Sequence, residues 1–444
     1  MKKNEPVSCP ECERMKQQIA SLQEELSLLK SGRSSRTSST PPSHDIGRSN
    51  GNSLRSKSGK KPGGQCGHQG HTLPVSDHPD EIIEHAAGYC RNCGQDLQNI
   101  EVHSRTVRQE VEIPPVHPRY IEHQSLTRLC PCCGLENKGD FPPDIKAPIQ
   151  YGSSVQSIIG YLSVFQHLPY NRIKTLLRDM FHLNLSEGSI DNILESMSRK
   201  SDWIYREIQG FMKHQTVVGS DETGCRSGGK KHWFHVWQNK LHTFIVSNAS
   251  RGYKVMEEYF PDGFPHSVYV SDCLPSQLKA PAKRHQLCIA HLLRELLNFE
   301  KSLKSQWSAG MKDLFCRALD LKRILKAEDY RNIPAEVMAI ETELDDLLAV
   351  DCSAFHRRER ALVHRLIKNR DSILTFLYHP EVPPDNNGSE RAIRNIKIKT
   401  KVSGQFRNKD GNGADCFARI RSVIDTAIKN GQEVYPALSC LAKA

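Results

Sequence analysis

The sequence lacks any apolar run that approaches the length of a membrane-spanning helix, and its first six residues lead into no apolar signal segment. We therefore expect a cytoplasmic protein that makes no membrane contact. Acidic residues are also relatively few, because 51 Asp and Glu face 61 Lys and Arg and leave a formal net charge of +10. A balance of this size also serves solubility, but it suits a polyanionic partner, and nucleic acid is the leading candidate.

The length excludes a small fold held together by disulfides, since 444 residues suffice for about three domains with a substantial core. Fifteen cysteines in a reducing compartment also argue against disulfide bonds. The cysteines that occur in pairs indicate metal binding, whereas the scattered ones are most simply small core or surface residues. The scattered cysteines are Cys225, Cys316, Cys352, Cys416 and Cys440.

Residues 1–30 combine a cysteine pair, Cys9 and Cys12, with apolar residues at heptad spacing. The apolar positions are Met15, Ile19, Leu22, Leu26 and Leu29. They predict a short coiled-coil helix for self-association, or an ordinary amphipathic helix, since they span little more than two heptads. The cysteine pair either shares a metal across two chains or consists of plain thiols. Residues 31–64 are basic and almost without apolar side chains, so we expect a flexible linker.

Residues 65–148 contain two metal-binding knuckles of the form Cys-x-x-Cys-Gly. The four predicted zinc ligands are Cys90, Cys93, Cys130 and Cys133. The glycine after each pair allows the tight turn that aims both thiolates at one ion, so the spacing predicts a zinc-ribbon DNA-binding module. Cys132 is an alternative ligand in the second knuckle. The β-prone segment 107–113 is expected to supply ribbon strands, and Cys66, His68 and His71 stay unassigned.

The rest of the chain predicts helices, then a mixed sheet, then helices again. Helical spacing covers 149–213, and 214–300 has the order strand, strand, strand, helix, strand, which opens a ribonuclease-H-like fold. The expected strands are 216–221, 232–237, 241–246, 267–272 and 285–289. Residues 301–380 look like a helical insertion, and 381–444 would complete this α/β core with the last acidic residue and a C-terminal tail.

Three acidic residues occupy positions that suit a divalent-metal site. Asp221 and Asp272 each end an apolar strand, and Glu390 opens a basic segment. Neighbouring strands would bring the two Asp side chains together, and clustered carboxylates repel unless a cation lies among them. Oxygen ligands suit Mg²⁺ or Mn²⁺, the ions that act in pairs on phosphodiesters. The alternative is that each strand-end Asp only forms a turn.

An ordered set of motifs resembles the insertion-sequence-66 family of bacterial transposases. The motifs are Asp-Glu-Thr-Gly at 221–224 before His232 and Trp233, the segments 288–296, 385–394 and 401–404, and the stretch 60–68. The resemblance implies a DDE transposase with a ribonuclease-H-like core, and it maps the catalytic, metal-binding triad onto Asp221, Asp272 and Glu390. The residues alone leave Glu222 and Glu295 as alternatives to Glu390.

Two details of the resemblance affect the second acid and its neighbours. Asp272 is followed by Cys273-Leu274-Pro275, where the family usually has a glycine-containing turn, and Asp262 is the alternative second acid. Cys288 and His291 would help to shape the site, or they are simply a packed cysteine and a hydrogen-bonded histidine.

The expected activity is nicking of a mobile element's ends, followed by transfer of the 3′ ends to target DNA through two metal ions. Basic residues near Glu390 would contact the DNA backbone, or form a solvated basic face. They are Arg391, Arg394, Lys397, Lys399, Lys401 and Arg407. Expected partners are double-stranded DNA, further copies of the chain and accessory proteins of the same element. The competing hypotheses are a zinc-ribbon DNA-binding regulator without catalysis and a general metal-dependent nuclease.

Overall fold

The computed structural model describes residues 11, 14–15, 18–19, 63, 65, 67–70, 72–408 and 410–444. The chain divides into two compact units, Arg48–His117 and a second that joins Met1–Gly47 to Pro118–Ala444. Cys9, Cys12, Cys66, His71 and most of the predicted coiled-coil helix and linker lie outside the described residues. Met15 and Ile19 are described, and both are helical and exposed. The coiled coil therefore stays a prediction.

The prediction of a ribbon strand at 107–113 is wrong: this segment forms no strand in the structure. Val107, Val111 and Ile113 are all largely exposed, so no apolar surface covers the face that a half-buried strand would present. Instead, a short antiparallel pair, β1 (Thr127–Leu129) and β2 (Glu136–Lys138), flanks the second cysteine knuckle. β-Propensity alone therefore misplaced the strands of this module.

The main body contains a five-stranded mixed sheet in the order β5-β4-β3-β6-β7. Its strands are β3 (Val217–Ser227), β4 (Lys230–Gln238), β5 (Thr243–Asn248), β6 (Phe264–Ser271) and β7 (Ala282–Leu287). β3, β4 and β5 are antiparallel neighbours, whereas β6 is parallel to both β3 and β7. The strands predicted from hydrophobic alternation are thus present, and the crossover from β5 to β6 runs through α6 (Lys254–Tyr259).

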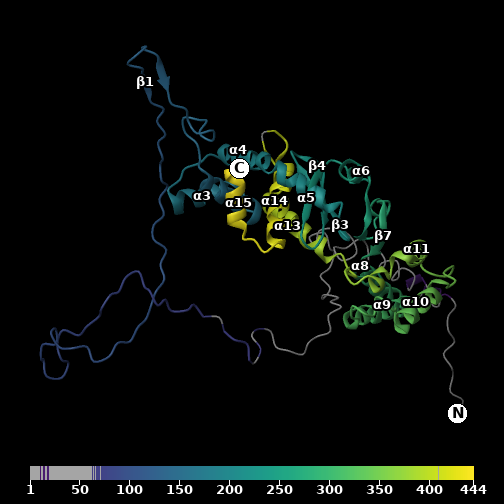
Figure 1. Ribbon diagram of the computed structural model, residues 1–444. Coiled ribbons are helices and arrows are strands. Elements are labelled where there is room, and N and C mark those ends of the chain that lie inside the picture. The colour runs from purple at the N-terminus through teal and green to yellow at the C-terminus, as the bar shows by residue number, and fades with distance from the viewer. Residues whose placement is uncertain are drawn as a thin grey trace. The chain divides into compact units, whose positions relative to one another are not determined.

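Helices cover both faces of this sheet (Figure 1). On one face, Trp237, Phe244 and Tyr269 pack with residues of α5 (Asp202–Met212) and α6. The other face meets helices from the chain's C-terminal part, α13 (Asn387–Ser403), α14 (Gly413–Lys429) and α15 (Val434–Lys443). Preceding helices pack into the same cluster: α2 (Ser153–Gly160), a π-helical turn η2 (Tyr161–Phe165), α3 (Tyr170–Phe181) and α4 (Glu187–Lys200). The helical segment before the sheet and the helices after it therefore share one core.

Helix α14 covers the edge of the sheet that β5 forms. The backbone N–H of Ile245 on β5 donates to Ser422 Oγ over 2.9 Å, and that of Thr243 donates to Thr426 Oγ1 over 3.1 Å. These bonds satisfy backbone groups that an edge strand would otherwise present to another chain.

A separate helical cluster follows β7, as the sequence predicts. It begins with α8 (Ile289–Leu303) and continues with α9 (Gln306–Ile324), α10 (Ala335–Leu348), α11 (Arg357–Lys368), the 3₁₀ turn η3 (Arg370–Ser372) and α12 (Thr375–Tyr378). These helices pack against Val268, Val270 and Leu287 of the sheet. Within the described ranges, no helix combines the length and the apolar character that a bilayer crossing needs.

Candidate active site

Asp221 and Asp272 lie at the same end of two neighbouring parallel strands. The β3–β6 register pairs Val217 with Val268 and Gly219 with Val270, and each Asp follows two residues after the last of these pairs. Both strands are buried because residues on both of their faces pack in a core. The alternative second acid, Asp262, precedes β6 and is exposed, so it lies at the opposite end of that strand.

Asp221 is buried, and its surroundings oppose its negative charge. Burial is the main cause that raises the pKa of its carboxyl well above the usual range, and the charges of Asp272 and Glu222 add to it. The Oδ1 atom accepts the Glu222 backbone N–H over 2.8 Å, which acts in the opposite direction. A carboxylate in this position gains from a bound cation. The donor set at this sheet edge therefore fits a divalent metal ion.

Glu390 reaches the same region because α13 approaches β3 very closely. Glu390 lies in the first turn of α13, and two glycines allow the approach. A Cβ atom on Gly219 would meet Gln238 Nε2 at 2.6 Å and Ser389 Oγ at 2.8 Å, and one on Gly388 would meet Gln238 Nε2 at 2.5 Å. Only residues without a side chain fit at these two positions.

Asn386, just before α13, joins the two strand ends. Its Nδ2 donates to the Ser220 carbonyl over 2.6 Å and to Asp272 Oδ1 over 3.1 Å. Its Oδ1 accepts the Ser389 hydroxyl over 2.7 Å, and its backbone N–H donates to Cys288 Sγ over 3.2 Å. The sequence analysis did not single out Asn386 for this role, although its place in the Asp-Asn-Asn-Gly-Ser-Glu motif is a signal that points to it.

His291 lies between the second and third acids. Its Nδ1 is 3.3 Å from Asp272 Oδ1, and its Nε2 is 3.7 Å from Glu390 Oε1. Burial acts to lower the pKa of His291, but hydrogen bonds with Asp272 and Cys288 outweigh it and raise that pKa to about 11. Arg294 Nη2 donates to Glu390 Oε1 over 3.3 Å. One imidazole ring therefore separates the two carboxylates, and nearby cations offset their charge.

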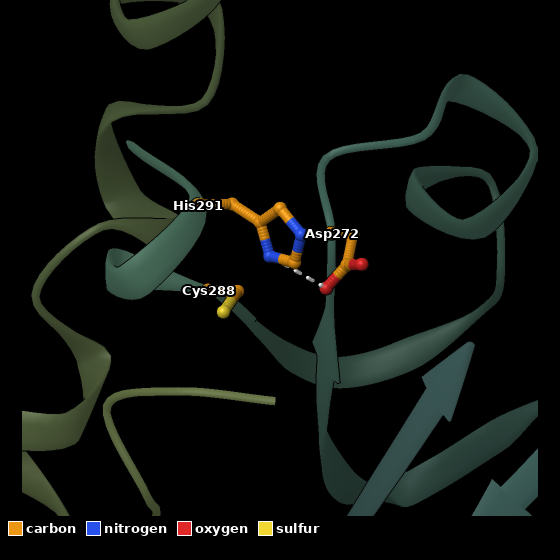
Figure 2. A group of neighbouring side chains, drawn as sticks. All are labelled: Asp272, Cys288 and His291. Carbon is orange, nitrogen blue, oxygen red and sulfur yellow. Dashed lines mark ion pairs between the residues drawn. The ribbon is translucent and has the colours of Figure 1, made fainter. Parts of the chain in front are cut away.

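Cys288 completes this group at the start of α8. A carboxylate oxygen of Asp272, Cys288 Sγ and a ring nitrogen of His291 all lie within 4.8 Å of one another (Figure 2). Cys288 is fully buried. The structure thus brings the predicted pair Cys288 and His291 together beside the second acid.

The two alternatives to Glu390 are engaged elsewhere. Glu222 is buried and forms an ion pair with Arg251 at 2.9 Å, and Gln277 Nε2 donates to its other oxygen over 2.6 Å. Glu295 forms an ion pair with Arg365 at 2.5 Å. Gln277 also accepts the Asp272 backbone N–H through Oε1 over 3.2 Å, so Glu222 supports the loop that carries Asp272.

The chain matches two family models. A model described as the Transposase IS66 family matches residues 148–414, which is more than half of the chain, and one described as the zinc-finger binding domain of transposase IS66 matches residues 88–134. The chain belongs to the IS66 transposase family. It is a DNA transposase with a zinc-finger DNA-binding domain. A search of curated proteins gives no match.

The basic residues of the transposase beside Glu390 divide into exposed and buried ones. Arg391, Arg394, Lys397, Lys401 and Arg407 are exposed. The predicted DNA contact of Lys399 is wrong, because its side chain is buried. Its Nζ donates to the carbonyls of Ser163 and Leu168, each over 3.0 Å, and burial lowers its pKa to about 8. Lys399 therefore ties α13 to the segment around η2.

The two knuckles of the transposase's zinc finger have the same backbone geometry. In each, the first cysteine's carbonyl accepts the N–H of the following glycine over 2.9 Å, and that glycine has a positive φ, 74° at Gly94 and 71° at Gly134. Backbone N–H groups of Cys93 and Asn92 lower the pKa of Cys90, and those of Cys133 and Cys132 do so for Cys130. N–H groups aimed at a sulfur favour the thiolate that zinc binds. The two knuckles belong to different compact units.

The turn after Asp272 has a backbone conformation that suits glycine, although this transposase has Cys273 there. Cys273 has φ of 61°, in the left-handed region that glycine adopts without strain. The thiol of Cys273 is buried, and burial raises its pKa to about 12.

Proposed function

We propose that this transposase cleaves the ends of its mobile element and joins the freed 3′ ends to target DNA at a site formed by Asp221, Asp272 and Glu390. The observation that carries the proposal is that His291 lies between Asp272, at the end of β6, and Glu390 of α13, while Asp221 on β3 is close enough to Asp272 for the Asp272 charge to raise its pKa. The sheet order, with three antiparallel strands beside two parallel ones, supports a ribonuclease-H-like core with α9 to α12 as its insertion.

The three carboxylates would hold two Mg²⁺ or Mn²⁺ ions. When bound, such ions activate the attacking oxygen and stabilise the leaving 3′ oxygen. The chain's own residues supply the rest. Asn386 orients Asp272, Gln277 fixes the backbone of Asp272, and Gly219 lets α13 bring Glu390 close. Glu390 and the exposed arginines that follow it share α13, so the acid and the phosphate contacts would be positioned together.

DNA binding would involve two parts of the chain. The exposed residues Arg391, Arg394, Lys397, Lys401 and Arg407 would contact phosphates near the site. The zinc finger would hold Zn²⁺ through Cys90, Cys93, Cys130 and Cys133, which the matching geometry of the two knuckles supports. We also propose a homo-oligomer that works with accessory proteins of the same element, since both element ends must be cut.

The direct test is a nicking assay with purified protein, Mg²⁺ and DNA that carries the element's ends. Wild type should nick these ends, whereas Asp221→Ala, Asp272→Ala and Glu390→Ala should not. Asp262→Ala is the matched control, because this exposed Asp lies at the far end of β6 and its loss should leave nicking intact. Nicking that survives in Asp221→Ala would refute the assignment. Equal cutting of scrambled ends would indicate a general nuclease instead.

A further inference from the structure

The group formed by Asp272, Cys288 and His291 has a ligand chemistry different from that of the three acids. It offers one oxygen, one sulfur and one nitrogen within 4.8 Å of one another. Mg²⁺ strongly prefers oxygen, whereas thiolate and imidazole select zinc and similar softer cations. Three protein ligands also leave a fourth position open, as in zinc sites that bind a water or a substrate.

The backbone holds the three side chains in place. Cys288 is the N-cap residue that immediately precedes α8, and its N–H donates to the Ser271 carbonyl next to Asp272 over 2.9 Å. The His291 N–H donates to the Cys288 carbonyl over 3.1 Å, so the first turn of α8 sets the Cys-x-x-His spacing. In Figure 2 the imidazole of His291 projects from the start of this helix toward the Asp272 carboxylate, and the Cys288 side chain lies beside the ring.

A second layer of contacts orients the donor atoms. Asn386 donates through its backbone N–H to Cys288 Sγ over 3.2 Å and through Nδ2 to Asp272 Oδ1 over 3.1 Å. Contacts of this kind fix the direction of metal ligands and tune their affinity. Cys288 is fully buried, whereas the His291 side chain is 25% exposed, so a cation has an approach from the His291 side.

We propose that Asp272, Cys288 and His291 form a Zn²⁺ site inside the active site, and that Zn²⁺ bound there inhibits DNA cleavage by withdrawing Asp272 from the catalytic ions. The inhibitory part rests on the proposed function, since it requires Asp272 to serve that reaction. The binding part does not, because the ligands and their geometry stand without any assumed activity.

Cobalt binding tests the site directly. The full-length protein, with its zinc finger loaded with Zn²⁺, is titrated with Co²⁺, which binds more weakly than Zn²⁺ and so leaves the finger occupied. A sulfur-to-cobalt charge-transfer band should appear in wild type and in Cys440→Ser, which removes an exposed thiol far along the chain. The band should be absent in Cys288→Ser. No band in wild type, or an unchanged band in Cys288→Ser, would overturn the proposal.

A second variant covers the case in which Cys288→Ser does not fold, as judged by its melting curve. His291→Gln keeps a polar side chain but removes the imidazole, and it should weaken Co²⁺ binding by at least the tenfold to 100-fold, roughly, that the loss of an outer-shell partner costs. Unchanged binding in His291→Gln would overturn the proposal.

The inhibition is tested in the nicking assay at fixed Mg²⁺. Added Zn²⁺ should stop cleavage by wild type and by Cys440→Ser, and Cys288→Ser should tolerate about tenfold more Zn²⁺ or beyond. Equal sensitivity would refute the inhibitory role. The two proposals can fail separately. If wild type shows the cobalt band but Asp221→Ala still nicks DNA, only the proposed function is refuted. If nicking depends on Asp221 but no cobalt band appears, only the zinc site is refuted.

Discussion

The side-chain amide of Asn386 donates a hydrogen bond to the carboxylate of Asp272 while it also holds the Ser220 carbonyl on the neighbouring strand. One residue before α13 therefore fixes the spacing of the strand ends that carry Asp221 and Asp272. A variant without this amide leaves a buried carbonyl and a partly buried carboxylate without their donor.

We expect Asn386→Ala to lower the free energy of unfolding by about 1 to 3 kcal/mol and to reduce nicking more than DNA binding. Chemical denaturation and the nicking assay measure the two effects. Asn387→Ala, at the next position, is the matched control and should match wild type in both measurements. Full nicking by Asn386→Ala would show that Asp272 is positioned by other contacts.

Gly219 predicts a second, purely steric effect. An added methyl group at this position would overlap Gln238 and Ser389, so Gly219→Ala should push α13 away from β3 and displace Glu390. Gly224→Ala on the same strand is the control, because its Cβ would meet Trp233 at an ordinary contact distance of 3.5 Å. We expect loss of nicking in the first variant only. If both variants nick equally, the close approach of α13 is not needed for catalysis.

Asp221 predicts a dependence of stability on pH in the metal-free protein. Its pKa is raised in the folded state, chiefly by burial, so its contribution to stability is present at low pH and is lost as the pH rises through that raised pKa. At neutral pH, Asp221→Asn should therefore raise the free energy of unfolding while it abolishes nicking. Thermal melts of both proteins from pH 4 to about pH 8 should diverge with rising pH. Parallel curves would contradict a buried, destabilising carboxylate.

Lys399 and Lys401 should behave differently although they lie on the same helix. Lys399→Met removes an ammonium group from the carbonyls of Ser163 and Leu168 and should cost about 2 kcal/mol of stability. Lys401→Met should leave stability unchanged and reduce the salt dependence of DNA binding, by a slope of about 0.9 for one lost phosphate contact. Melting curves and salt titrations of DNA affinity distinguish the two. The reverse pattern would place Lys399 on the DNA.

The zinc knuckles predict a selective effect of cysteine replacement. Cys133→Ser should release zinc from the purified protein and weaken DNA binding, because Cys133 follows Cys130 at the same spacing as Cys93 follows Cys90. Cys132→Ser should keep its zinc. Elemental analysis of the metal content decides, and zinc loss in Cys132→Ser alone would make Cys132 the ligand of the second knuckle.

Hydrophobic alternation was sufficient to predict the strands around the site. Val217, Gly219 and Asp221 share a strand face, as expected, and Asp272 follows directly after β6. The prediction of a ribbon strand at 107–113 was wrong because β-propensity does not reveal whether other residues pack against the segment, and here its apolar side chains are exposed.

The charge of Lys399 predicted a DNA contact, whereas its helical spacing indicates a buried position. Lys399 lies three residues after Ile396 and seven after Ala392, and both of these are buried. It therefore occupies the apolar stripe of α13. The contacts of Asn386 and Gln277 depend on tertiary packing, which no local pattern reveals.

The position of helices α9 to α12 along the chain has a consequence during protein synthesis. These helices separate the third acid from the first two along the chain, so a growing polypeptide already holds Asp221 and Asp272 long before α13 is translated. Under the proposed function, a fragment released at any point within α9 to α12 would be unable to damage chromosomal DNA, and only a chain translated past α13 would be able to mobilise its element.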